Sequence, residues 1–202
     1  MENYVYLDGQ KQLLTEDQEI RVRRALAPPT LGEIAEGQVV SLGGVEFIVL
    51  RHLVDATEVI TRDVIWQTIF DGETNNYAQS GLREIMDRLA DQLAGAVGAE
   101  NLLRHTVSLT ADDGLKDYGQ VVDRASPLTA GQYRTYVEIL DRYPVEQWWW
   151  LATPYTTPTH DTDNLVRCVS PLGALFQEHH EAKDGGVRPF LCLSSKTPIR
   201  SV

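Results

Sequence analysis

Three consecutive tryptophans near the C-terminus constrain the fold of this chain more than any other feature. They open the segment 148–154, which a Thr-, Pro- and Asp-rich stretch follows, and the chain then reaches the segment 185–190, where Arg188 precedes a proline. Because side chains alternate between the two faces of a strand, the first and third rings would share one face and the second would take the other. At least one of these rings is expected to lie in a core.

Length, composition and charge predict a single acidic domain with an N-terminal arm. The 202 residues, of which 43% are hydrophobic, suffice for one ordinary core, which we expect over residues 31–202, with the arm over residues 1–30. No apolar run is long enough to span a bilayer, and the first residues lack the pattern of a secretory signal. We therefore expect a cytoplasmic protein without membrane insertion. The net charge of −11 disfavours nucleic acid as a partner.

The arm is expected to contain a short helix. Thr15 and Gln18 have the spacing of a capping box, which predicts a helix over residues 16–25, and Pro28-Pro29 would end it. The basic cluster in this helix is flanked by acidic residues, so we interpret it as a solvated segment. We expect the arm to pack on the domain or on a neighbouring molecule.

The domain is predicted to combine short strands with two helices, an arrangement typical of an α+β fold. Capping residues predict one helix after Ser80 and one after Thr129. Gly43-Gly44 and residues 184–186 are expected to form the turns of two hairpins. Strands are predicted over residues 39–40, 45–50, 57–61, 107–109, 165–169, 172–176 and 187–193. The inner helix faces are expected to be Leu82, Ile85, Met86, Leu89 and Leu93, and Tyr133, Tyr136, Val137 and Leu140.

Five motifs, in this order along the chain, resemble a bacterial and phage domain family of unknown function. They are residues 45–50, Ser80-Gly81-Leu82-Arg83, Leu128-Thr129, residues 148–154 and Gly186-Val187-Arg188-Pro189. The family is common in gut bacteria, their phages and prophages, and it has the C-type lectin-like fold shared by the formylglycine-generating enzymes. The resemblance covers residues 32–195. The chain departs from the family pattern at Ala152-Thr153, where an Arg-Ser pair is usual, and at Ile85-Met86-Asp87, where Trp-Leu-Asn is usual.

The resemblance implies a C-type lectin-like fold, with two helices packed on short, mostly antiparallel strands and a long-loop region on one face. In relatives of this fold that face binds sugars, proteins or peptides. We therefore expect a non-catalytic binding or assembly module, associated with a phage or prophage as a virion component or in recognition of a host or partner. Its expected partner is another protein or a second copy of the chain. A glycan-binding lectin and a cysteine enzyme related to the formylglycine-generating group remain alternatives.

The expected binding surface is the long-loop face, formed by residues 148–155 and the loop 156–164, with residues 75–77 as a candidate addition. The residues predicted to contact a ligand or partner are Trp148, Trp149, Trp150, Tyr155, Asp161, Asp163, Asn164 and Arg188. An exposed pair of tryptophans would form a stacking surface for a sugar or an anchor for a protein, and the alternative that we favour is core packing of all three. Arg188 would either face a ligand or, as we favour, tie the long loop through its carbonyls, Asp161 or Asp163.

The sequence predicts neither a metal site nor a cofactor. Residues 160–164 carry oxygen ligands that could hold calcium, but the sugar-binding triplets of C-type lectins are absent. Adjacent His179 and His180 would point to opposite sides of a strand and could not chelate one ion. Cys168 and Cys192 lie in strand-like runs, away from the loop where formylglycine-generating enzymes carry their cysteine pair. We expect two buried free thiols rather than a disulfide, and no enzymatic activity.

Overall fold

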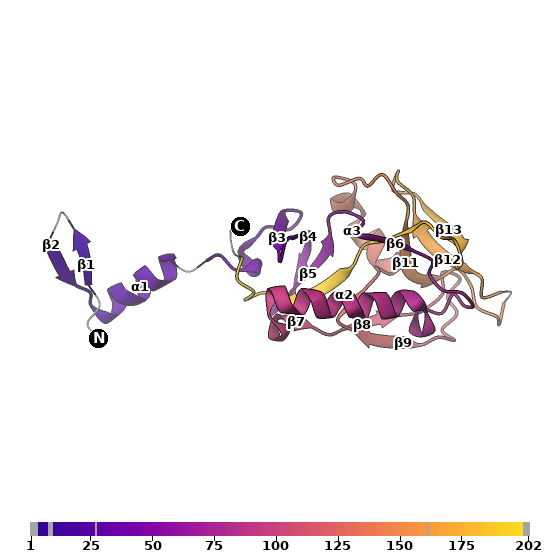
Figure 1. Cartoon of the computed structure of the whole chain (residues 1–202), viewed down its shortest axis with the longest axis horizontal. Helices are drawn as coiled ribbons and strands as arrows, with labels where there is room; N and C mark the ends of the chain where they lie inside the picture. Colours follow the sequence, from indigo (N-terminus) through magenta and orange to yellow (C-terminus); the bar gives the residue numbers. More distant parts are fainter. Residues whose placement is uncertain (1–3, 8–9, 27, 161, 200–202) are drawn as a thin grey trace.

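The computed structural model describes residues 4–7, 10–26, 28–160 and 162–199. Helices and strands alternate along these residues. They form an α+β domain preceded by an arm (Figure 1). Asp161, one of the predicted site residues, lies outside the described residues. Among the described residues, no helix combines the length and the apolar character that crossing a bilayer requires.

The arm and the domain contain the following elements. The arm has β1 (Tyr4–Leu7), β2 (Gln10–Leu13) and α1 (Glu16–Leu26). The helices of the domain are η1 (Leu31–Glu33), η2 (Tyr77–Gln79), α2 (Gly81–Val97), η3 (Ala99–Asn101) and α3 (Ala130–Leu140). Its strands are β3 (Val39–Leu42), β4 (Val45–His52), β5 (Ala56–Thr61), β6 (Trp66–Thr68), β7 (Leu102–Leu103), β8 (His105–Ser108), β9 (Gln120–Asp123), β10 (Ala125–Ser126), β11 (Trp149–Pro154), β12 (Leu165–Val169), β13 (Leu175–His179), β14 (Gly185–Val187) and β15 (Phe190–Ser194).

Two sheets form the body of the domain. The strand order of the first is β10-β15-β5-β4-β3, with β7 also paired to β15, and that of the second is β13-β12-β11-β14-β6. β11 and β14 run parallel, whereas the other paired strands that the structure describes are antiparallel. The sequence prediction of short, mostly antiparallel strands is therefore confirmed.

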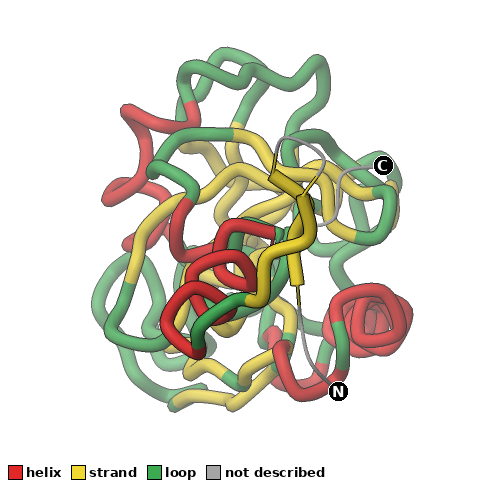
Figure 2. The backbone as a smooth tube through the Cα atoms, turned by 90° about the vertical axis from the view of Figure 1, so that its left-hand side faces the viewer, coloured by secondary structure: helices red, strands yellow, loops and turns green. Residues whose placement is uncertain are grey.

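The first sheet lies between two hydrophobic clusters because its side chains alternate between its faces. Phe47 and Val49 of β4 belong to the cluster that contains α2, whereas Ile48 and Leu50 belong to the cluster that contains α3. Figure 2 looks along the long axis and shows α2 end-on to one side of the strands. The buried helix residues are Leu82, Met86, Ala90, Leu93 and Val97 in α2, and Ala130, Tyr133, Tyr136 and Leu140 in α3. The predicted inner faces are confirmed, although Ile85, Leu89 and Val137 are only partly buried.

The first predicted hairpin is confirmed, and its turn is correct to the residue, although both strands are two residues longer than predicted. β3 and β4 pair with Leu42 opposite Val45, which leaves Gly43 and Gly44 as the two-residue turn. Their φ angles are 59° and 81°. Both values lie in the left-handed region that such turns require and that glycine adopts without steric cost.

The second predicted turn is wrong. Gly185 and Gly186 are not in a turn but in β14, where they pair with Thr68 and Gln67 of β6. A Cβ atom on Gly185 would lie 1.9 Å from Nε1 of Trp150, so this strand position has room for glycine alone. The residue is there because the indole ring occupies the space that a side chain would need.

The neighbouring strand predictions need two further corrections. Leu172 was predicted to begin a strand, but it lies in the turn between β12 and β13, and β13 begins at Leu175. The predicted strand over residues 187–193 is divided into β14 and β15 by Arg188 and Pro189. Proline has no N–H group and cannot donate to a ladder, which explains the division.

The arm extends away from the domain (Figure 1). Its helix is capped as predicted, since the Thr15 main-chain N–H donates to Oε1 of Gln18 at 3.0 Å and the Gln18 N–H donates to Oγ1 of Thr15 at 3.3 Å. The chain joins the domain at Leu31, whose N–H donates to the carbonyl of Thr197 at 2.8 Å. The end of the arm does contact its own domain, since the carbonyl of Pro29 accepts from the N–H of Ile199 at 2.7 Å and Thr30 forms a β-bridge with Pro198. Packing of the rest of the arm on a neighbouring molecule stays a prediction.

The capping box of α3 leads to a first prediction. The Thr129 N–H donates to Oε1 of Gln132 at 2.9 Å, and the Gln132 N–H donates to Oγ1 of Thr129 at 3.1 Å. Thr129→Ala removes the hydroxyl and is expected to lower the free energy of unfolding by about 1 kcal/mol, measured by urea denaturation. Thr129→Ser keeps the hydroxyl and is the matched control. Equal losses in the two variants would show that the cap contributes nothing.

Candidate functional site

The three tryptophans are divided between the two hydrophobic clusters. Trp149 and Trp150 are each 1% exposed, and they belong to the clusters of α3 and α2 respectively. The half-buried ring of Trp148 lies 4.7 Å from that of Trp150 and 5.9 Å from that of Phe176, centroid to centroid. The predicted alternation is confirmed, as is core packing for the second and third rings. An exposed pair of stacking tryptophans is therefore wrong.

Arg188 is buried, with an exposed fraction of 2%, and it ties a different segment from the one predicted. Its Nε and Nη2 atoms donate to the carbonyl of Thr61 at 3.2 and 3.0 Å, and Nη2 also donates to the carbonyl of Arg62 at 2.8 Å. These carbonyls lie at the end of β5, not in the long loop. The predicted tie through Asp163 is wrong, and the alternative through Asp161 lies outside the described residues.

The guanidinium of Arg188 is a buried cation beside an aromatic ring. Its central carbon lies 4.9 Å from the ring centroid of Trp149, within the range of a cation–π contact. Burial lowers the pKa of Arg188 to about 10, so the group stays protonated at neutral pH. No carboxylate of the described residues forms an ion pair with it, although the charge of Asp63 raises this pKa against the larger effect of burial.

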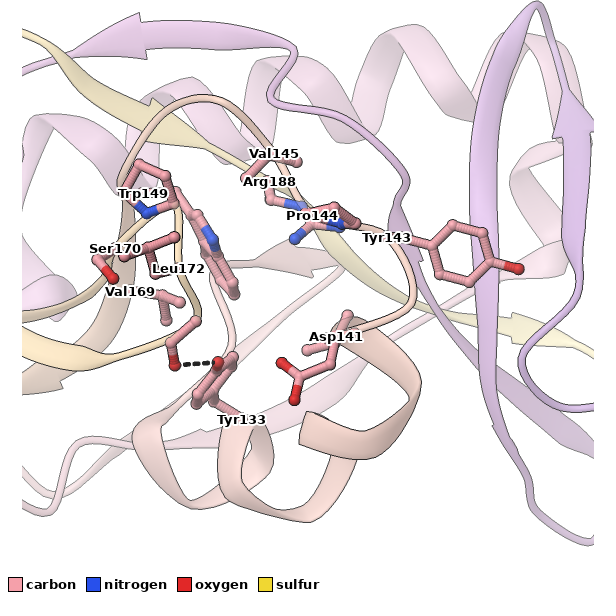
Figure 3. A pocket seen from close by; sticks show the side chains of 13 residues that line it. Tyr133, Asp141, Tyr143, Pro144, Val145, Trp149, Val169, Ser170, Leu172 and Arg188 are labelled. Atoms are coloured by element: carbon pink, nitrogen blue, oxygen red, sulfur yellow. Dashed lines mark hydrogen bonds between the residues drawn. The ribbon is translucent and has the colours of Figure 1, made fainter.

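Trp149 and Arg188 line a cavity of about 270 Å³, which we call the Trp149–Arg188 pocket (Figure 3). It lies between the end of α3 and the turn from β12 to β13. Val145 gives it an apolar wall, and the exposed side chains of Leu172 and Asp141 lie at its rim. The hydroxyl of Tyr133 also lines it and donates to the carbonyl of Gly173 at 2.6 Å, which ties the helix to the turn. The pocket thus has a cationic wall, apolar sides and an acidic rim.

The long loop is held by residues outside the tryptophan segment. Nδ2 of the fully buried Asn75 donates to the carbonyls of Thr156 and Leu165, both at 2.9 Å, and its Oδ1 accepts from the hydroxyl of Tyr118 at 2.9 Å. Asp113 accepts from the hydroxyl of Thr156 at 2.6 Å, a hydrogen bond that lowers the pKa of this carboxyl. The sequence places Asn75 in a polar loop and carries no sign of these partners, which lie 81 and 90 positions along the chain.

The other predicted contact residues within the described ranges do not line the pocket. Tyr155 is exposed on the long loop, where the guanidinium of Arg167 lies 5.9 Å from its ring centroid. The carbonyl of Asp163 accepts from the main-chain N–H of Asn75 at 2.8 Å, and Oδ1 of Asn164 accepts from the hydroxyl of Thr162. Among the predicted site residues that the structure describes, Trp149 and Arg188 alone are brought together at one cavity.

The histidine prediction is wrong in its geometry. The rings of His179 and His180 do not point apart but lie with their centroids 4.5 Å from one another. The chain leaves β13 at the first of them, so the strand alternation does not extend to the second. Nδ1 of the buried His180 is 2.9 Å from the carbonyl of Asp71. The described residues contain no group of three or more His, Cys, Asp or Glu side chains arranged to hold a metal ion.

Both cysteines are free and buried, as the sequence predicts. Cys168 lies in β12 of the second sheet and Cys192 in β15 of the first, so they do not face one another as neighbours in one sheet. Burial raises the pKa of both thiols, most strongly that of Cys168. A buried thiol with a raised pKa is a poor source of the thiolate that nucleophilic chemistry needs.

A second hollow, which sequence reasoning missed, lies beside α2. It is a groove of about 550 Å³ lined by the exposed ring of Trp66 and by apolar side chains that include Ile65, Ile85 and Leu89. The signal was present in the sequence, because the apolar face predicted for α2 is wider than the buried face that the structure shows. The two extra positions, Ile85 and Leu89, border this groove.

Comparison with known proteins does not assign the chain to a group. No protein-family model, no curated protein and no solved structure matches it. The evidence for a function therefore comes from the chemistry of the Trp149–Arg188 pocket and from the exposed apolar side chains of the arm.

Proposed function

We propose that this protein is a non-catalytic binding and assembly module with a C-type lectin-like fold, associated with a phage or prophage as a virion component or in recognition of a host or partner. In this proposal the arm joins the domain to a protein partner or to a second copy of the chain. The α+β architecture, with its mostly antiparallel strands and a long loop before the last strands, is compatible with that fold. Function is argued from the surfaces, since one fold supports many activities.

The observation that best supports this proposal is the exposure of apolar side chains of the arm to solvent. Leu13 of β2 is 61% exposed and Ile20 of α1 is 56% exposed. A two-stranded sheet is marginal in water by itself, and so is a helix of 11 residues. Neither hydrophobic cluster of the domain includes any of the arm residues whose burial the structure describes, which are 4, 10, 13–21 and 28–30. Such a segment gains stability when another surface covers it, and a neighbouring subunit would supply that surface.

The two alternatives have less support. A lectin that stacks sugars on tryptophan needs exposed rings, whereas Trp149 and Trp150 are buried. An enzyme that uses Cys168 or Cys192 needs an accessible thiolate, whereas burial raises the pKa of both thiols. The arm is the feature that an assembly module would need and that neither alternative uses.

Removal of residues 1–27 tests this proposal. We expect the shortened chain to keep its fold, because the two domain cores are built from residues 31–199, and to lose the oligomeric or partner state of the full chain. Size-exclusion chromatography with light scattering measures the state, and circular dichroism checks the fold. If the truncated chain folds and still contains the same number of chains per assembly as the full chain, the proposal is refuted.

A pair of substitutions gives a finer test in the full chain. Leu13→Gln combined with Ile20→Gln makes the arm polar without shortening it, and we expect the same loss of association. The matched control is Val54→Gln, which makes the same kind of change at an exposed position of the turn between β4 and β5. Equal association of both variants would mean that the apolar side chains of the arm are not the contact.

A further inference from the structure

The Trp149–Arg188 pocket contains a positive charge that forms no ion pair with any carboxylate of the described residues. A buried charge is costly unless it is paired or hydrogen-bonded, and the direct contacts that offset this cost for Arg188 are two carbonyl oxygens and an aromatic face. We propose that the pocket binds the carboxylate of a small monocarboxylic acid, with Nη1 of Arg188 as the donor. This site is separate from the arm, and the inference goes beyond the assembly function proposed above.

The hydrogen bonds of Arg188 leave one side of the guanidinium unused. Nε and Nη2 make the bonds to Thr61 and Arg62, whereas Nη1 has no hydrogen-bond partner among the described residues. Nη1 is not fully enclosed by protein atoms, unlike the Nε atoms of Arg124 and Arg167. Because Arg188 lines the pocket, we infer that the free side of Nη1 faces the cavity. Figure 3 shows the Arg188 side chain at the pocket wall beside Trp149. Arginine N–H groups match the planar oxygens of a carboxylate and form strong, charge-assisted hydrogen bonds with them.

The three fixed hydrogen bonds hold the guanidinium in one place before a ligand arrives. The ring of Trp149 lies 4.9 Å from its central carbon and restricts it further. A donor that is already ordered loses little conformational freedom when an anion binds, which favours affinity. The same hydrogen bonds explain why the residue can be structural and still have a free donor.

The walls of the pocket select the rest of the ligand. Its volume of about 270 Å³ is slightly below the range of roughly 300–1,000 Å³ for sites of drug-sized ligands, which favours a small molecule. Val145 and Leu172 offer apolar surface to a hydrocarbon body. Asp141 lines the rim and would repel a second negative charge, so a monocarboxylate fits better than a dicarboxylate or a phosphate.

Titration of the full-length protein with benzoate tests this inference, measured by isothermal calorimetry. Benzamide has the same shape without the charge, and inorganic phosphate has charge without the apolar body. We expect benzoate to bind at millimolar concentrations, and benzamide and phosphate to bind at least several-fold more weakly. Equal binding of benzoate and benzamide, no binding of benzoate, or preference for phosphate would each overturn the proposal.

Two rim substitutions locate the site without disturbing the core. Leu172 is 96% exposed, so Leu172→Glu should fold normally and weaken benzoate binding by roughly two- to fivefold, the range expected for one exposed charge. Asp141→Asn should strengthen it by a similar factor. Val54→Glu adds the same charge at a position that is 98% exposed and does not line the pocket, so it is the control for Leu172→Glu. Equal effects of the two glutamates would refute this location. The mass of the oligomer, measured separately, reports on the arm and not on this pocket.

Discussion

Trp149→Ala is expected to lower the free energy of unfolding by about 3–5 kcal/mol, the cost typical of removing a large aromatic side chain from a core. The ring is 1% exposed and lies edge-on to that of Tyr133, with 5.8 Å between centroids. It also covers one face of the Arg188 guanidinium, so its removal leaves a cavity beside a buried charge. Both effects act in the same direction.

Chemical denaturation followed by circular dichroism measures this loss. Trp66→Ala is the matched control, because it removes the same side chain from an exposed position of β6 and surface changes usually stay within about 0.5 kcal/mol. Similar losses in the two variants would contradict the placement of Trp149 in the core. The comparison therefore tests burial rather than tryptophan content.

Gly185→Ala is expected to destabilise the domain by about 1–3 kcal/mol or more, although it adds a single methyl group. The added Cβ would lie 1.9 Å from Nε1 and 2.2 Å from Cε2 of Trp150. The indole cannot easily move away, because its N–H donates to the carbonyl of Thr68 at 3.0 Å and its ring packs against that of Trp148. Relief of the clash requires β14 to shift relative to β11 or β6.

Gly95→Ala is the control for this prediction and should have the opposite sign. Gly95 lies inside α2, and no atom lies within 4 Å of the position that its Cβ would take. Alanine in a helix interior is more stable than glycine by about 0.5–1 kcal/mol. Thermal unfolding of the two variants would thus move in opposite directions. A stable Gly185→Ala variant would show that β14 and Trp150 are not in close contact.

Turns, helix caps and one strand were predicted correctly because each depends on residues that are neighbours in the sequence. The Gly43-Gly44 turn needs positive φ angles, and the caps at Ser80 and Thr129 need a side-chain oxygen at one position, so each can be found from neighbouring residues. The strand over residues 165–169 was found to the residue because of its apolar pattern. The C-type lectin-like fold, in contrast, rests on resemblance and stays a proposal.

Contacts between distant parts of the chain could not be predicted in the same way. Gly185-Gly186 has the local chemistry of a turn, but its role is set by the ring of Trp150. The partners of Arg188 lie 126 and 127 positions away and are carbonyl groups, which every residue has. For this reason the sequence named both residues of the Trp149–Arg188 pocket without predicting the pocket. It also gave no sign that Asn75 holds the long loop.

The alternation along β4 and β5 has a consequence for how the domain loses its structure. Adjacent residues, such as Val59 and Ile60, contribute to opposite clusters while sharing one stretch of backbone. If α2 or α3 detaches, one face of the first sheet becomes exposed to water. The hydrophobic cluster on the other face then packs against strands that are no longer held in place from both sides. We therefore expect that neither half folds separately and that the domain unfolds in one cooperative transition.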